Sequence, residues 1–212
     1  MKTLKTWAAA AAIVALTGSA QAALIDRGGG MIYDTTRNLT WLANMNTNGL
    51  MTWTAATTWA NNLVHGGFDD WRLPTLNPAD ASCTGGFGLG VGFNCTGGEL
   101  SGLFVTDLGN KANESVLIQV GDTAEQIANL ALFSNVQSYV YWSGTESAPF
   151  PAFAWYFSTT NGLQEFGGKV SALYAVAVRP GDVAASVPEP QTLALALLAL
   201  GATMVVRRRR PR

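Results

Sequence analysis

Acidic side chains beside aromatic residues are the first candidates for chemistry in this chain of 212 residues. Asp69 and Asp70 directly precede a tryptophan, and Glu146 follows the strand-like segment 139–142. Carboxylate and backbone carbonyl oxygens are the ligands that a hard cation such as calcium prefers. We therefore treat Asp69, Asp70 and Glu146 as candidate metal ligands and calcium as the candidate cofactor. The alternative is that these acids are solvated or cap turns.

Three tryptophans are candidates for a sugar-binding surface. A flat indole ring can cover the apolar face of a pyranose, and such a contact needs no metal. Trp71, Trp142 and Trp155 lie in motif-like or strand-like segments and are the candidate ligand-binding residues. The alternative for each is a ring that fills the hydrophobic core.

The sequence gives little support for catalysis, and we predict no catalytic residues and no enzyme. His65 is the single histidine and stands beside two glycines, which suits a helix end better than a general base. No Ser-His-Asp arrangement, phosphate loop or metal cluster stands out. A carboxylate pair such as Asp69 and Glu146 could in principle cleave glycosides if the fold brought the two together.

The two cysteines, Cys83 and Cys95, enclose a glycine-rich segment. In an oxidising compartment, two cysteines so close in sequence are expected to form a disulfide. The spacing is not the Cys-x-x-Cys of redox pairs, and two thiols with one distant histidine do not make a tetrahedral zinc site. We therefore predict a structural disulfide. Whether the apolar stretch 87–93 inside it forms a contact surface or folds under is left open.

Hydrophobic periodicity predicts short strands at 31–33 and 39–42 and two helices after them. Thr52 can cap a helix that runs to about Val64, and a second helix is expected at 98–108, before Gly109. The apolar faces of the two helices are Trp53, Ala56, Ala60 and Val64, and Leu100, Leu103, Phe104 and Leu108. Strand-like segments follow at 139–142, 154–157 and 174–178. Two helices followed by a mainly antiparallel sheet predict an α+β domain.

The N-terminus has the three parts of a secretory signal peptide. Lys2 and Lys5 precede an apolar centre at 7–16, and Ala20-Gln21-Ala22 is a small-x-small cleavage site. We predict a signal peptide at 1–22 and a mature chain that starts near Ala23, outside the cytoplasmic membrane.

The C-terminus predicts a membrane segment followed by a positive stop. Residues 192–206 are apolar or small without a charge, and as a helix they would span roughly 23 Å. Arg207, Arg208, Arg209 and Arg210 follow at once, which is the positive-inside pattern. We predict a C-terminal transmembrane helix. A buried core helix is the alternative, and nothing follows the arginines for it to pack against.

Charge excludes polyanionic partners for the exported part. Between Asp26 and Glu189 the chain has fourteen acidic and six basic residues, a net formal charge of −8. Such a surface repels nucleic acid and anionic lipid. We predict no nucleic-acid partner, and a ligand that is neutral, cationic or bridged by a divalent ion.

The order Pro188-Glu189-Pro190, apolar helix and arginine cluster resembles the PEP-CTERM sorting signal over about the last 26 residues. The prolines keep the tripeptide extended ahead of the helix. The resemblance implies that a membrane-embedded exosortase is a partner that recognises and processes the tail. The predicted sorting-signal residues are Pro188, Glu189, Pro190, Arg207, Arg208, Arg209 and Arg210.

Five ordered segments resemble the Lcl C-terminal domain family over about residues 30–182. They are DTTRNLTWL (34–42), FDDWRLPT (68–75), YWSGTE (141–146), AWYF (154–157) and YAVAVRP (174–180). The second also resembles a segment of the sulfatase-modifying enzymes. Both groups imply a C-type lectin-like fold. The calcium-binding triplets of C-type lectins are absent, since Asn77-Pro78 is followed by Ala79 and Trp142 by Ser143-Gly144.

Together these features predict a signal peptide (1–22), a C-type lectin-like domain (23–186) and a PEP-CTERM signal (187–212). The protein is expected in the cell envelope, on the outer surface or in the extracellular matrix, with its C-terminal helix in the inner membrane transiently or stably. The predicted function is binding of exopolysaccharide or another surface component. The alternatives are a structural or adhesion protein with protein partners and no sugar site, and a cryptic glycan-active enzyme.

Overall fold

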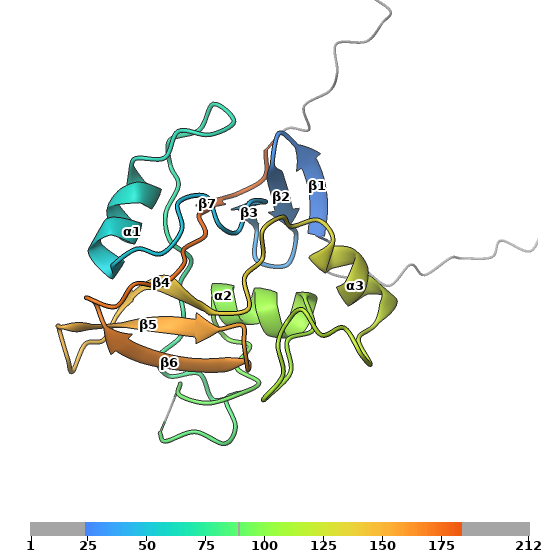
Figure 1. Ribbon diagram of the computed structural model, residues 1–212. Coiled ribbons are helices and arrows are strands. Elements are labelled where there is room, and N and C mark those ends of the chain that lie inside the picture. Colours follow the sequence, from blue (N-terminus) through green and yellow to red (C-terminus); the bar gives the residue numbers. More distant parts are fainter. Residues whose placement is uncertain (1–23, 89, 184–212) are drawn as a thin grey trace, which may run out of the picture.

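The computed structural model describes residues 24–88 and 90–183, which form a mixed fold of two antiparallel sheets and few helices (Figure 1). The first sheet has the order β1-β2-β3-β7 and the second β4-β5-β6. The strands are β1 (Leu24–Gly28), β2 (Met31–Asp34), β3 (Leu39–Leu42), β4 (Val140–Glu146), β5 (Phe153–Ser158), β6 (Leu163–Gly168) and β7 (Val178–Pro180). The α+β class is thus confirmed. The predicted C-terminal helix at 192–206 lies outside the described residues.

The helices lie between and beside the sheets (Figure 1). They are α1 (Trp53–Asn61), α2 (Glu99–Gly102), the π-helical turn η1 (Leu103–Asp107) and α3 (Ala124–Leu130). Thr52 caps α1 as predicted, since its side chain accepts a hydrogen bond from the backbone N–H of Ala55. No helix within the described residues is long and apolar enough to cross a membrane.

The core is built around large aromatic side chains from both sheets. Phe104 of η1 stacks on Phe157 of β5 and contacts Tyr141 of β4, with 5.5 Å between ring centroids in each pair. Trp41 and Trp142 are also fully buried. The predicted apolar faces of the two helices are largely correct, because Ala56, Ala60 and all four residues of the second set are buried.

Three sequence-based expectations about the elements need correction, and three elements were missed. Helix α1 ends at Asn61, and Val64 lies beyond it with 73% of its surface exposed. The second helix changes to a π-helical turn after Gly102. The segment 174–178 makes single bridges, such as that of Tyr174 with Tyr141, before β7 begins. Strands β1 and β6 and helix α3 were not predicted.

Two charged clusters fix the ends of the first sheet. Arg37 donates to both Asp34 and Asp107, which joins the turn after β2 to η1. Arg27 of β1 pairs with Asp182 just after β7, so the first and last described strands are tied together.

Candidate functional site

Two of the three candidate tryptophans are core residues and cannot present a ring to a sugar. Trp71 and Trp142 are buried, and their indole N–H groups donate to the backbone oxygens of His65 and Met51 at 3.3 and 3.0 Å. Their burial favours the alternative, in which these two rings fill the hydrophobic core. Their size explains the outcome, because large rings with one satisfied N–H fill cores well. Trp155 is also largely buried but lines a pocket described below.

The three candidate metal ligands do not gather into one site. Arg179 donates to both carboxylate oxygens of Asp70, at 2.7 and 3.0 Å, and this pairing lowers the pKa of Asp70. Glu146, in β4 of the second sheet, pairs with Lys169, which directly follows β6 of the same sheet. Asp69, Asp70 and Glu146 form no close ligand group among the described residues. The calcium candidates stay a prediction, and protein cations already pair with two of the three carboxylates, those of Asp70 and Glu146.

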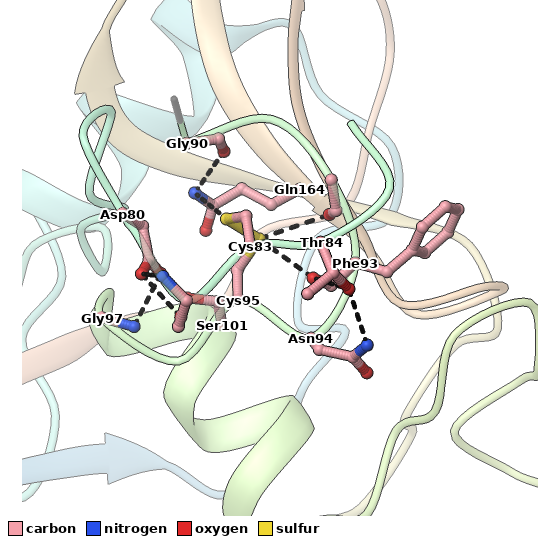
Figure 2. The surroundings of a disulfide bond; sticks show 12 residues. Asp80, Cys83, Thr84, Gly90, Phe93, Asn94, Cys95, Gly97, Ser101 and Gln164 are labelled. Carbon is pink, nitrogen blue, oxygen red and sulfur yellow. Dashed lines mark hydrogen bonds between the residues drawn. A yellow bond between two sulfur atoms is a disulfide. The ribbon is translucent and has the colours of Figure 1, made fainter. Parts of the chain in front are cut away.

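One ligand-like group is present in the described part of the chain, and its chemistry does not suit a metal. Asp80, Cys83 and Cys95 lie together, but the two sulfurs are bonded to each other at 2.06 Å. The predicted disulfide is therefore confirmed. Although burial raises the pKa of Asp80, hydrogen bonds from Ser82 and from the N–H of Gly97 outweigh it and lower this pKa. Asp80 thus anchors the base of the disulfide loop (Figure 2).

The disulfide loop, residues 83–95, projects beyond β6 and exposes an aromatic ring. Thr84 and Phe93 exchange two backbone hydrogen bonds of 2.8 Å above the disulfide, so the loop starts as a narrow hairpin. A Cβ on Gly86 would lie 1.7 Å from the carbonyl oxygen of Val91, so only glycine fits there. Phe87 is 97% exposed. The loop is therefore held tightly at its base and presents an apolar side chain to solvent.

A pocket of about 250 Å³ lies between this loop and the second sheet. The tip of the β4–β5 hairpin supplies one wall, the disulfide loop another, and Trp155 and Phe166 are the aromatic residues that β5 and β6 contribute. Its lining residues are Pro78, Phe87, Val91, Glu146, Ser147, Ala148, Pro149, Phe150, Trp155 and Phe166. The pocket is therefore apolar, with a single ionisable side chain.

Contacting aromatic rings build the side of the pocket formed by the second sheet. The centroids of Phe166 and Trp155 are 5.3 Å apart, and Phe150 stacks on Phe166 at 6.0 Å. Phe153 meets both phenylalanines edge to face, at 6.0 and 6.1 Å. Phe150 is 53% exposed although it belongs to this cluster. The cluster thus keeps ring surface accessible beside the pocket while it supports the hairpin tip.

Polar groups near the pocket are few and already oriented. The ammonium group of Lys169 pairs with the Glu146 carboxylate and lies 4.4 Å from the centroid of the Trp53 ring. The Glu146 side chain remains more than half exposed, so its carboxylate can still accept hydrogen bonds from a ligand. The arrangement suits a ligand with both apolar surface and hydroxyl donors.

The ion pairs leave no isolated cation for an anionic ligand in the described segments. Each of the six basic side chains there pairs with a carboxylate: Arg27, Arg37, Arg72, Lys111, Lys169 and Arg179. His65 has a structural contact, because its ring nitrogen Nε2 donates to the carbonyl oxygen of Gly29 at 2.8 Å. The described part of the chain therefore offers no unpaired basic side chain to an anionic group.

The class that fold and site define is a mixed α+β domain with an aromatic pocket on its second sheet. Its destination comes from the C-terminus, where residues 186–210 match the family described as the PEP-CTERM protein-sorting motif. The match covers the predicted sorting signal and indicates an exported protein that an exosortase sorts to the cell envelope. No curated protein and no solved structure matches the chain.

Sequence reasoning missed the phenylalanines of the pocket. Phe150 and Phe153 stand in a loop-like segment with two prolines, and Phe166 stands in a stretch with two glycines, so neither segment has strand periodicity. A signal that could have identified Phe150 and Phe153 is the high density of aromatic residues in the short segment 150–157. The stretch 87–93, left open above, supplies a pocket wall through Phe87 and Val91.

Proposed function

We propose that the exported domain is a non-catalytic binding module that holds a neutral extracellular polysaccharide, or another surface component, at the aromatic pocket. The observation that supports the proposal most is the pairing of accessible ring surface with one exposed carboxylate. The apolar faces of sugar rings can pack on Phe150 and Phe166, and sugar hydroxyls can donate to Glu146. The sorting motif indicates export to the cell envelope, and an extracellular polysaccharide ligand is compatible with that location.

The charges of the domain favour a neutral ligand within this proposal. The exported part has many more acidic than basic residues, and each described basic side chain already has a carboxylate partner. An anionic polymer would be repelled at long range and would find no unpaired cation at contact. The C-type lectin-like identity of the domain and its boundaries at 23–186 belong to this proposal.

A second candidate function is supported by a different surface. Leu117, Ile118, Val120 and Ile127 are all exposed in and near α3. Apolar side chains that gather at one surface are typical of protein contacts. A structural or adhesion protein that binds other proteins through these residues is therefore the alternative. A glycan-active enzyme is the third candidate, and the ion pair of Glu146 with Lys169 weighs against Glu146 as a general acid.

A titration tests the proposed function. The exported protein, produced in an oxidising compartment, is titrated with the exopolysaccharide of its host and a panel of neutral glycans, with calcium and with chelator. Saturable binding that is indifferent to chelator is expected, because the pocket uses rings rather than a metal. Binding that chelator abolishes would revive the metal candidates. No binding to any glycan would contradict the proposal, and loss of polymer length would favour the enzyme.

A further inference from the structure

The side chain of Gln164, in β6, bonds to two segments whose neighbouring residues line the aromatic pocket. Its side-chain Nε2 donates to the carbonyl oxygen of Gly90 at 2.7 Å (Figure 2). It also donates to the carbonyl oxygen of Asn77 at 3.1 Å. Asn77 immediately precedes Pro78 and Gly90 immediately precedes Val91, and both Pro78 and Val91 line the pocket. One amide group therefore contacts the residues next to two walls.

A third wall of the pocket contains Phe166, which is in the same strand as Gln164. Phe166 is two residues after Gln164 in β6, and side chains two apart in a strand point to the same face. The backbone N–H and C=O of Gln164 also pair with Gly92, at 2.8 and 3.0 Å. The side chain that orients the loop and the ring that lines the pocket thus share one short strand.

The disulfide alone does not fix this geometry. It closes the loop at Cys83 and Cys95, whereas Phe87 and Val91 lie in the interior of a glycine-rich loop. Glycine has the largest backbone entropy to lose on ordering, so such a loop needs additional contacts above its base. The Gln164 amide lies 3.9 Å from the Cys83 sulfur and reaches past the disulfide to Gly90.

The burial of Gln164 indicates a role beyond filling space. The side chain is fully buried, and its Oε1 has no hydrogen-bond partner among the described residues. A buried polar atom without a partner costs folding free energy that an apolar side chain would not. We therefore look for the role of this amide in the two hydrogen bonds that it donates, to Gly90 in the loop and to Asn77.

We propose that Gln164 is a positioning residue of the aromatic pocket, which sets the distance between the disulfide loop, the Asn77–Pro78 segment and Phe166. Only the binding readout of this proposal rests on the proposed function. The order of the loop can be measured without any ligand.

The test is the variant Gln164→Leu, with Asn129→Leu as a matched control. The leucine keeps the size and the backbone pairing with Gly92 but removes both donors. Asn129 is a buried amide far from the pocket, on α3, and its Nδ2 donates to the carbonyl oxygen of Asp107 at 3.1 Å. Amide hydrogen exchange of Thr84, Gly92 and Phe93 is compared with that of the β2–β3 amides.

In Gln164→Leu we expect the hydrogen-exchange rates of the three loop amides to rise at least about tenfold, with little change in those of β2 and β3. In Asn129→Leu the loop amides should exchange as slowly as in the parent. Affinity for exopolysaccharide should fall about tenfold or more. Unchanged loop exchange, or a rise shared equally by the whole core, would overturn the proposal. Faster loop exchange in a protein that binds no polysaccharide would leave the positioning role intact and refute only the proposed function.

A second variant keeps the proposal testable if Gln164→Leu does not fold. In Gly90→Ala the new Cβ would lie 2.3 Å from the carbonyl oxygen of Pro78, at a backbone φ of +76° that disfavours alanine. This change pushes the same two segments apart while Gln164 stays in place. The same loop-specific rise in exchange is expected, and a loop that stays as protected as in the parent would contradict the proposal.

Discussion

The ring of Phe150, at the tip of the β4–β5 hairpin, stacks on the ring of Phe166 in β6 with an interplanar angle of 24°. This contact joins the hairpin tip to strand β6, and both residues line the pocket. Phe150 remains 53% exposed although its ring contacts both Phe166 and Phe153. An accessible ring held by a second ring is pre-organised for contact with a flat apolar ligand surface, which lowers the entropy cost of binding.

The first prediction concerns this exposed ring. Phe150→Ala should weaken binding of exopolysaccharide at least about tenfold, or ~1.4 kcal/mol, because it removes a ring contact without opening the core. The measurement is a titration of variant and parent side by side. Val64→Ala, which truncates an exposed apolar side chain beyond the pocket, should bind like the parent. Equal affinities of all three proteins would show that Phe150 does not contact the ligand.

The second prediction separates core tryptophans from the pocket. Trp142→Phe should lower the free energy of unfolding by about 1–3 kcal/mol, since it leaves a void and removes the hydrogen bond to Met51. Its affinity for polysaccharide should stay within about twofold of the parent under conditions where it is folded. Urea unfolding and titration check the two parts. A stable Trp142→Phe variant that no longer binds would restore Trp142 as a ligand residue.

The third prediction concerns the disulfide. A Cys83→Ser and Cys95→Ser double variant should be less stable by about 3 kcal/mol, because the unfolded chain regains the freedom of a loop with a sequence separation of 12. Urea unfolding of the variant against the parent measures the loss. The parent treated with reductant should show a similar loss. A variant as stable as the oxidised parent would mean that the Thr84–Phe93 hairpin holds the loop without the disulfide.

The fourth prediction concerns pH. Burial, reinforced by the charge of Asp34, raises the pKa of Asp107 to about 6 even though Arg37 pairs with it. The folded state therefore binds this proton more tightly than the unfolded chain. The stabilising contribution is complete below about pH 4 and is lost as pH rises through about 6. Asp107→Asn should consequently gain stability relative to the parent, by about 2 kcal/mol, between pH 4 and 7.

The opposite sign is expected at Asp70, which serves as the control. Arg179 lowers the pKa of Asp70, so its contribution is present above pH ~4 and is lost as pH falls through the folded pKa. Asp70→Asn should therefore lose stability relative to the parent at neutral pH and recover toward it in acid. Unfolding free energies of the three proteins across this pH range give both slopes. A pH-independent difference for Asp107→Asn would refute the raised pKa.

The fifth prediction concerns sorting. Replacement of Pro188, Glu189 and Pro190 by alanine should prevent exosortase processing, so that the chain accumulates in the inner membrane fraction. Immunoblots of fractionated cells, compared with an exosortase deletion strain, measure this. The two strains should give the same pattern. Normal processing of the alanine variant would mean that the tripeptide is not what the exosortase recognises.

The sequence predicted those parts of the fold that local patterns determine. Thr52 as a helix cap, the strand pair 31–33 and 39–42, and the apolar set Leu100 to Leu108 all depend on spacing along the chain. Strand β6 was missed because LQEFGG has two glycines and polar residues, and its pairing with β5 stabilises it. A strand that tertiary contacts stabilise gives no periodic signal.

The site was predictable only in part, for a related reason. The disulfide follows from two cysteines in an exported chain. Whether a large aromatic ring is buried or exposed does not follow from its residue type, since Trp142 is buried while Phe150 is half exposed. Likewise Asp70 and Glu146 could be ligands by type, but Arg179 and Lys169 reach them from more than twenty residues away in sequence. Long-range pairing decides which polar and aromatic groups remain available.

The most direct test of the binding site is an NMR titration, with exopolysaccharide, of the exported protein labelled at phenylalanine, leucine and isoleucine. Saturable shifts of the ring signals of Phe150, Phe153 and Phe166 are expected, without shifts of the buried Phe104. Shifts confined to residues around Leu117 and Ile127, or no shift of any ring near the pocket at saturating polysaccharide, would contradict the account.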